Sequence, residues 1–121
     1  MIGIGVDLVD VARMRKALER TPSLADRLFT PDELAYARAA TDPTQRLAAR
    51  FAAKEAVMKA LGVGLGAFDW HDVEVTRADN GAPSLGVTGR AAELARTAGV
   101  TSWKVTLSHT DAVAEAIAVA L

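Results

Sequence analysis

The stretch that decides the fold is "RFAAKEAVMKALG", which runs from Arg50 to Gly62 and has the spacing of a long α-helix. On a helical wheel an apolar stripe about 80° wide is formed by Leu47, Phe51, Met58 and Leu61. Lys54 projects near the middle of this stripe, and Arg50 and Glu55 lie at its edges. Lys54 is therefore either a snorkelling side chain, whose stem covers apolar surface, or a binding group.

Local signals mark where this helix and two earlier ones begin or end. The motif "DPTQ" at residues 42–45 is typical of a helix start, and Gly62 is expected to end the long helix. The motif "TPDE" at 30–33 predicts a second helix, which Thr30 and Glu33 cap reciprocally. Asp10 is expected to cap a third helix that runs to about Arg20.

The remaining segments have the two-residue period of β-strands. In "MIGIGVDL" at 1–8, isoleucine, valine and leucine alternate with Gly3, Gly5 and Asp7, which predicts a half-buried strand. Further strands are expected over 73–77, 84–87, 102–108 and 112–121, with a helix over 88–98. The last strand has one face of alanines, flat enough for a helix to approach closely. One strand, several consecutive helices and then a β-rich part predict an α+β fold, with a mostly antiparallel sheet against the long helix.

Length and composition narrow the class of protein. A chain of 121 residues with 50% hydrophobic and 24% charged residues predicts one globular domain over 1–121. Its formal net charge of -1 gives no reason to expect binding to nucleic acid or to a membrane. The absence of cysteine excludes a disulfide framework and a thiolate zinc site. With no basic leader and no long apolar run in the sequence, we expect a cytoplasmic protein.

Two carboxylates and several basic residues form the strongest candidate site. Asp7 lies on a strand face that it shares with glycines, and Glu55 lies at the margin of the helical stripe. Taken alone, Asp7 could be a surface residue, and Glu55 could pair with Lys59 one turn later. Two carboxylates together with phosphate oxygens and water are, however, a suitable set of ligands for Mg²⁺. Arg50, Lys54 and Lys59 could neutralise the remaining phosphate charge.

Other polar segments are weaker candidates. His109 lies in a turn rich in hydrogen-bonding groups with Ser108, Thr110 and Asp111, where it could equally cap a hairpin. The "NGAP" segment at 80–83 is first a hairpin turn, and His71 reads as structural. The run "GVGLGAF" at 62–68 follows a helix and lacks the Lys-Ser/Thr ending of a phosphate-binding loop.

Taken together, "GIGVD" at 3–7, "RFAAKEAVMKALG" at 50–62, "NGAP" at 80–83 and "LSHT" at 107–110 resemble the bacterial holo-acyl-carrier-protein synthases. These are the small trimeric class of 4'-phosphopantetheinyl transferases. The resemblance implies their fold and the transfer of 4'-phosphopantetheine from coenzyme A to a serine of apo acyl carrier protein. The second product is adenosine 3',5'-bisphosphate.

The resemblance also implies roles for individual residues. Asp7 and Glu55 would be the Mg²⁺ ligands, and the expected contacts to coenzyme A are Arg50, Lys54, Lys59, Asn80, Gly81, Pro83, Ser108, His109 and Thr110. The base that accepts the serine proton stays open between a metal-bound water, Glu55, His109 and Asp111. The family further implies a homotrimer with sites between subunits, and a carrier for fatty acid or polyketide synthesis.

A basic helix face is the candidate surface for the carrier protein, which is usually acidic. It comprises Arg13, Lys16, Arg20 and Arg27. The plainer alternative is a solvated helix face. Two other functions also remain open: a magnesium-dependent nucleotide phosphohydrolase and a regulatory domain that binds a nucleotide without turning it over.

Overall fold

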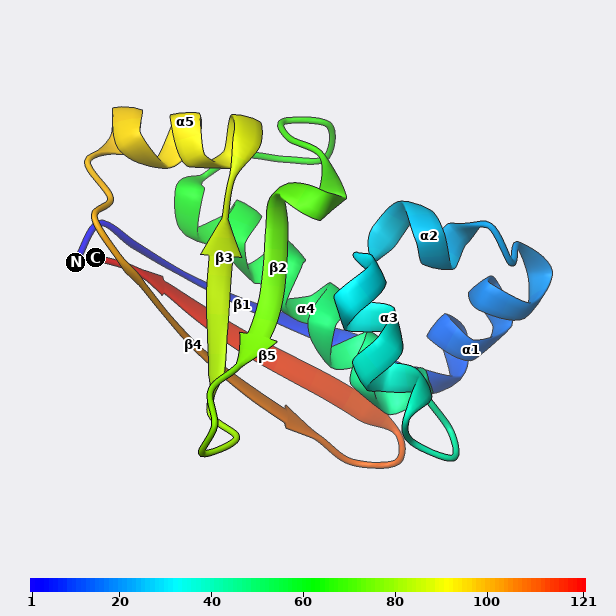
Figure 1. The fold of residues 1–121 in the computed structure, drawn as a ribbon. Helices are drawn as coiled ribbons and strands as arrows, with labels where there is room; N and C mark the ends of the chain where they lie inside the picture. The colour runs from blue at the N-terminus through cyan, green and yellow to red at the C-terminus, as the bar shows by residue number, and fades with distance from the viewer.

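The structure is a computed structural model that describes residues 1–121, and it has the predicted α+β composition (Figure 1). The strands are β1 (Gly3–Asp10), β2 (Val73–Arg77), β3 (Pro83–Val87), β4 (Trp103–His109) and β5 (Val113–Ala120). The helices are α1 (Val11–Arg20), α2 (Leu24–Leu28), α3 (Pro31–Arg38), α4 (Thr44–Leu61) and α5 (Gly89–Ala98), with a 3-10 turn η1 (Trp70–Asp72) before β2. No helix is at once long enough and apolar enough to cross a lipid bilayer.

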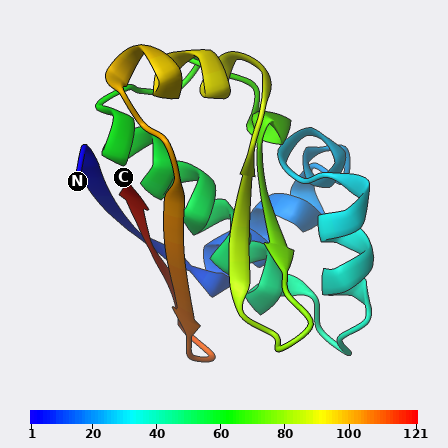
Figure 2. The ribbon, with the colours of Figure 1, turned by 60° about the vertical axis from the view of Figure 1, so that its left-hand side comes forward.

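All strand pairs are antiparallel, and the strands form two sheets that lie side by side (Figure 2). The larger sheet has the order β1-β5-β4, and the smaller one is the β2-β3 hairpin. Because β1 and β5 are paired, the two ends of the chain lie next to each other. Helices α1, α2 and α3 gather at the other end of the molecule, around the start of α4 (Figures 1 and 2).

Small residues let α4 lie directly on the larger sheet. The alanines of β5 that face α4 are completely buried, which confirms the prediction of a flat strand face for a helix. On β1, a Cβ atom added to Gly3 or Gly5 would lie 2.0 Å from the carbonyl oxygen of Ala60 or Ala56 of α4. Only glycine leaves room for a helix backbone at that distance. The glycine face of β1 is therefore the face that packs against α4.

As a result, β1 presents its apolar side chains to the outside. Ile4, Val6 and Leu8 are 57%, 47% and 65% exposed, respectively. The predicted strand and its alternation are confirmed, but the usual assignment of the apolar face to the core does not apply. The partly exposed residues of β5 lie on the same side, because each pairs with an outward-facing residue of β1. The outer side of β1 and β5 is thus largely apolar, whereas β4 adds the exposed polar residues Lys104, Thr106 and Ser108 to the same face.

Helix α4 is buried over most of its circumference, so the stripe seen in the sequence is only part of its buried surface. It packs against both sheets and against α1, α3 and α5. Its tightest contacts come from alanines, which an apolar stripe of large residues does not reveal. Lys54 points into this packed interior and has no exposed surface. It is not a snorkelling residue, because its ammonium group does not reach water.

Most helix ends follow from the predicted caps. The side chain of Asp10 accepts a hydrogen bond from the Arg13 amide, and Thr30 and Glu33 form a reciprocal capping box. Gly62 ends α4 in the left-handed conformation, with φ of 70°. Helix α4 itself begins at Thr44, whose amide donates to the Asp42 carboxylate. Helix α2 and the turn η1 were not predicted, because five and three residues are too short to show a helical period.

Candidate active site

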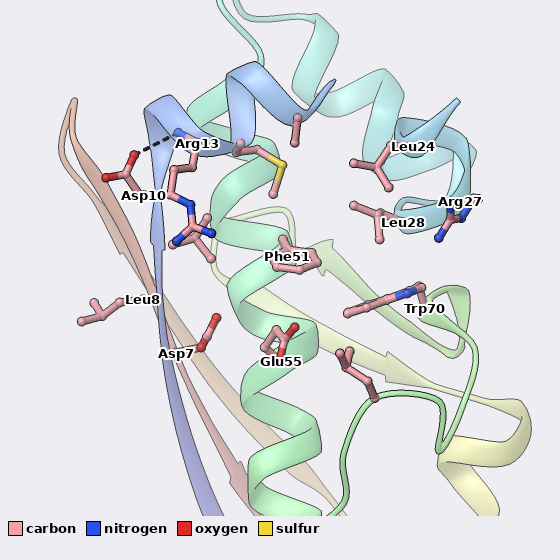
Figure 3. Close-up of a pocket in the computed structure, with 14 residues that line it drawn as sticks. Asp7, Leu8, Asp10, Arg13, Leu24, Arg27, Leu28, Phe51, Glu55 and Trp70 are labelled. Atoms are coloured by element: carbon pink, nitrogen blue, oxygen red, sulfur yellow. Dashed lines mark hydrogen bonds between the residues drawn. The ribbon is translucent and has the colours of Figure 1, made fainter. Parts of the chain in front are cut away.

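Asp7 and Glu55 face each other across a pocket between β1 and α4 (Figure 3). Asp7 is on the glycine face of β1, and Glu55 is a half-buried residue of α4. The pocket has a volume of about 530 Å³, and we call it the carboxylate pocket. Two predicted metal ligands that are 48 positions apart in the sequence therefore share one cavity.

Only one of the two carboxylates forms an ion pair. Lys59 Nζ lies 3.0 Å from Asp7 Oδ1 and 2.9 Å from the Val6 carbonyl oxygen, so it pairs with Asp7 rather than with Glu55. Burial raises the pKa of Glu55, and the negative charge of Asp7 adds to this effect while Lys59 opposes it. A carboxylate held near a second one without its own cation is a favourable ligand for a divalent ion.

The two carboxylates fit a Mg²⁺ ion that shares its ligands with water and substrate better than they fit a metal ion bound only by protein side chains. No group of three or more His, Cys, Asp or Glu side chains is placed to hold a metal ion. Two carboxylates would leave most positions of an octahedral ion to water and to phosphate oxygens. This arrangement is typical of Mg²⁺ sites that bind together with a phosphorylated substrate.

Apolar and basic residues surround the two carboxylates. Phe51 of α4 and Trp70 of η1 stack with ring centroids 5.1 Å apart and form one wall. Leu24 and Leu28 of α2 extend this wall. Arg13 and Arg27, predicted from the basic helix face, both line the pocket, whereas Lys16 and Arg20 are exposed on α1 and do not. Two of the four basic residues thus lie at the mouth of the candidate site.

A second pocket of about 590 Å³ collects three arginines around Tyr36, and we call it the arginine pocket. The guanidinium carbons of Arg46 and Arg50 lie 4.3 Å from the centre of the Tyr36 ring, and that of Arg77 lies 5.0 Å from it. None of the three forms an ion pair with a carboxylate. Three positive charges without carboxylate partners make this pocket suitable for a polyanion.

Arg50 is the most constrained of these arginines. Its side chain is almost completely buried, and its Nε has no hydrogen-bond partner. Burial lowers its pKa below the usual value, although the neighbouring groups Tyr36 and Glu33 oppose this shift. A buried cation that lacks an anionic partner gains stability when an anion binds to it.

The arginine pocket also takes in several residues expected to contact coenzyme A. Gly81, Pro83 and His109 line it together with Arg50. Asn80 caps its own turn by accepting a hydrogen bond from the Ala82 amide at 3.0 Å, and Thr110 likewise caps the β4–β5 hairpin. Ser108 is exposed near the end of β4. Asp111 accepts a hydrogen bond from Gln45, a residue of the arginine pocket, at 2.9 Å.

Lys54 belongs to neither pocket, and here the expectation of a phosphate contact is wrong. Its ammonium group has no exposed surface and donates to the Glu33 carboxylate at 2.8 Å, to the Trp70 carbonyl oxygen at 3.1 Å and to the Val73 carbonyl oxygen. These three bonds use all of its donors inside the protein. No donor is left for a ligand, so Lys54 is a structural residue in this conformation.

The two pockets have no residue in common, although both include residues of α4. Arg50 and Glu55 are five positions apart, which separates them by about 140° around the helix. Sequence reasoning missed Tyr36, Arg46 and Arg77 of the arginine pocket. The spacing of Arg46 and Arg50, one helical turn, was a usable signal for the first arginine. No local pattern links Tyr36 or Arg77 to them.

Comparison with known proteins identifies the family. Residues 3–120 match the model of the 4'-phosphopantetheinyl transferase superfamily. A holo-[acyl-carrier-protein] synthase of Streptomyces avermitilis is 51% identical over 120 residues, which are 99% of this chain and 97% of the relative. The corresponding enzyme of Moorella thermoacetica is 48% identical over 118 residues, which are 98% of this chain and 92% of the relative.

Solved structures give the same result. The holo-[acyl-carrier-protein] synthase of Neisseria meningitidis superposes with a TM-score of 0.90 at 29% identity, covering 100% of this chain and 98% of its own. The Helicobacter pylori synthase, solved in complex with coenzyme A, superposes with a TM-score of 0.86 at 28% identity, covering 98% and 99%. The fold, the paired carboxylates and the similarity along almost the whole chain agree, and the chain belongs to the 4'-phosphopantetheinyl transferase superfamily.

Proposed function

We propose that this chain transfers the 4'-phosphopantetheine group from coenzyme A to a serine hydroxyl of apo acyl carrier protein. Two relatives that share about half of their residues with this chain, over nearly their full length, are holo-[acyl-carrier-protein] synthases. The observation that carries the proposal is the pairing of Asp7 and Glu55 in one pocket, on a chain that also has an arginine pocket without carboxylate partners. The carboxylate pocket would bind a metal-bound pyrophosphate, and the arginine pocket would bind a further phosphate.

In this reaction the serine oxygen forms a bond to the phosphorus nearest to pantetheine. The bond from that phosphorus to the bridging oxygen breaks, and adenosine 3',5'-bisphosphate leaves. Asp7 and Glu55 would hold Mg²⁺, which supplies charge stabilisation to the pyrophosphate when bound. Lys59, which already contacts Asp7, would neutralise further charge beside it.

The serine proton must pass to a base, and the candidates are Glu55, His109, Asp111 and water. Glu55 is in the carboxylate pocket, and its raised pKa makes it a stronger base than an ordinary carboxylate. His109 and Asp111 lie at or beside the arginine pocket, away from Glu55 of the same chain. Within one chain, Glu55 and water are therefore the better candidates.

The arginine pocket would bind the negatively charged nucleotide end of coenzyme A. Arg46, Arg50 and Arg77 can each donate to phosphate oxygens with paired N–H groups. His109, Gly81 and Pro83 line the same pocket, and Asn80, Ser108 and Thr110 belong to the turns and strand end beside it. We retain all six as proposed contacts to coenzyme A.

We further propose a homotrimer in which each site combines pockets of two neighbouring subunits. Two observations support it: Ile4, Val6 and Leu8 form an exposed apolar row on the outer side of β1, and the two pockets of one chain share no residue. An exposed apolar patch of this kind is typical of a subunit interface. Burying Ile4, Val6 and Leu8 against partner strands would bring the carboxylate pocket of one chain toward the arginine pocket of the next.

The carrier protein would approach the mouth of the carboxylate pocket. Arg13 and Arg27 lie there, and Arg20 and Lys16 continue the basic surface along α1. Attraction between this surface and an acidic carrier would mainly raise the association rate. We place the enzyme in the cytoplasm, where it would serve fatty acid or polyketide synthesis.

A mass-shift assay tests the reaction. The protein is incubated with coenzyme A and apo acyl carrier protein, with Mg²⁺ or with excess chelator, and the carrier is weighed by mass spectrometry. A gain of one phosphopantetheine that needs the metal supports the proposal. Release of nucleotide without a mass gain indicates a phosphohydrolase instead, and binding of coenzyme A without either product indicates a regulatory domain.

Subunit mixing tests the composite site. A Glu55→Gln variant has a defective carboxylate pocket, and an Arg50→Ala variant has a defective arginine pocket. Each variant is therefore expected to be inactive alone. After unfolding and refolding together, mixed oligomers contain sites with both pockets intact, and part of the activity returns. If each site lies within one chain, the mixture stays as inactive as its components.

A further inference from the structure

The buried pair of Lys54 and Glu33 is the most extensively bonded polar group in the interior, and the proposed reaction does not use it. Both side chains have no exposed surface. Besides Lys54, the Glu33 carboxylate accepts hydrogen bonds from the Thr30 amide at 3.0 Å and from the Val75 amide at 2.9 Å. Lys54 in turn donates to the carbonyl oxygens of Trp70 and Val73. The pair therefore ties together α4, α3, η1 and β2.

Each of these elements supplies a wall of one of the two pockets. Turn η1 brings Trp70 to the carboxylate pocket, where its ring stacks on Phe51. Helix α3 brings Tyr36 to the arginine pocket, and β2 brings Arg77. Helix α4 carries residues of both pockets, one turn before Lys54 and immediately after it. No other pair of side chains has hydrogen bonds that together connect all four elements.

Stability alone does not account for such a pair. Burying two charges costs several kcal/mol per ion, and replacing a buried ion pair by apolar residues of similar size is often neutral or stabilising. Hydrogen bonds are directional, whereas apolar contacts are not, so the pair selects one arrangement of the elements that it joins. Its bonds to the carbonyl oxygens of Trp70, the first residue of η1, and of Val73, directly after η1, leave Trp70 little freedom to move.

We propose that Lys54 and Glu33 are positioning residues for phosphopantetheinyl transfer: they hold Trp70, Tyr36 and Arg77 in register with Glu55 and Arg50 of α4. This inference rests on the proposed function. The substrate contacts are made by the pocket residues, and the pair acts only through them. A shift of about 1 Å in either wall would misplace the pyrophosphate relative to the attacking oxygen, and misplacement of this size costs up to about a hundredfold in rate.

Three variants separate positioning from stability. Lys54→Met removes the charge at similar length but leaves Glu33 buried without its partner, so its melting temperature is expected to fall. Adding Glu33→Gln to Lys54→Met removes both charges and keeps an acceptor for a backbone amide, so most of the melting temperature returns. Val100→Ala is the matched control, because Val100 is buried in a cluster that lines neither pocket.

The readouts are kcat with saturating substrates, the KM for coenzyme A, and the dissociation constant of adenosine 3',5'-bisphosphate alone. All are measured at a temperature where each variant is folded by circular dichroism. We expect kcat of the double variant to fall by about ten- to a hundredfold and the dissociation constant to rise several-fold, while Val100→Ala keeps wild-type values. Because the nucleotide alone reports on the arginine pocket, its dissociation constant shows whether Tyr36 and Arg77 have moved. A fall in kcat without a change in this constant points to the carboxylate pocket instead.

The outcomes are distinct. If the folded double variant keeps wild-type kcat, KM and nucleotide affinity, the pair is only structural and the inference is wrong. If the double variant does not fold, Glu33→Gln alone is used, and wild-type kinetics in that variant likewise overturn the inference. If the wild-type protein itself transfers no phosphopantetheine, the proposed function has failed, whereas loss in the variants alone leaves it intact.

Discussion

The substitution Gly5→Ala tests the close approach of β1 to α4. A Cβ atom at this position would lie 2.0 Å from the Ala56 carbonyl oxygen, 2.8 Å from the Ala60 amide nitrogen and 2.9 Å from Lys59 Cβ. To reach ordinary contact at 3.4 Å, strand and helix must separate by about 1.4 Å. Two of the three neighbours are backbone atoms of a packed helix, so no side-chain rotation can relieve the clash.

We expect this variant to lose about 3 kcal/mol of unfolding free energy, at the upper end of the usual range for overpacked sites. For a chain of this size, the loss corresponds to a fall in Tm on the order of 10 °C. Transfer activity should fall as well, because Asp7 is two residues further along β1 and moves with it. Thermal melts by circular dichroism, at one fixed protein concentration, measure the first effect.

Gly86→Ala is the matched control. Gly86 is also in a strand, but a Cβ there would be 3.9 Å from its nearest neighbour, the Glu74 carbonyl oxygen. Its unfolding free energy should stay within about 0.5 kcal/mol of the wild type. If Gly5→Ala melts within about 2 °C of Gly86→Ala, the strand and helix are not as close as described and the reasoning is refuted.

Three further predictions concern the site and the surfaces. Burial raises the pKa of Glu55, so its ionised form opposes folding above the carboxyl's ordinary pKa of 4.5. Without metal, the Glu55→Gln variant should therefore have a higher Tm than the wild type at pH 7. The difference should vanish below that pKa, where both side chains are neutral, and the variant should have lost transfer activity at pH 7; a lower Tm at pH 7 contradicts the assignment. Arg13→Glu should weaken carrier binding, most strongly at low salt, and leave coenzyme A affinity unchanged; titrations alongside Arg90→Glu, the same charge change on α5, measure both. Ile4→Asp puts a charge on the exposed apolar residues of β1 and should convert the proposed trimer to monomers in light scattering, whereas an unchanged mass would remove that face from the interface.

The features that the sequence predicted well are those decided by nearby residues. The caps at Asp10, Thr30 and Gly62 depend on groups within four positions, so the ends of three helices could be read directly. Strand periodicity also identified all five strands to within one or two residues. The α+β class followed from the order of these elements, and it is confirmed.

The features that could not be predicted depend on distant partners. Alternation along β1 does not say which face is inside, and the answer depended on the glycines meeting α4. The burial of Lys54 depends on Glu33, which is 21 positions away, and on backbone carbonyls of a turn that has no period. A lysine in an apolar stripe therefore looked like a ligand when it was an interior ion pair.

The site was predicted in part. Asp7 and Glu55 were named from their places on a strand face shared with glycines and at the margin of the helical stripe, and the family resemblance gave both the role of metal ligand. The structure brings the two residues together in one pocket. The arginine pocket was predicted in part. Four of its residues were expected to bind one ligand, and they do line one cavity: Arg50, Gly81, Pro83 and His109. Tyr36 and Arg77 come from α3 and β2, and only the folded chain shows that their side chains converge on Arg50.

Because α4 carries residues of two separate pockets, the effect of a defective chain in the proposed trimer depends on whether the defect impairs one of these pockets or both. In a ring of composite sites, a chain defective at Glu55 or at Arg50 disables one site, and a chain defective at both disables two. When such chains mix at random with wild-type chains, activity falls in proportion to the wild-type fraction in the first case and to its square in the second. In the proposed trimer, a change confined to one side of this helix would therefore be less dominant than a change that affects both sides.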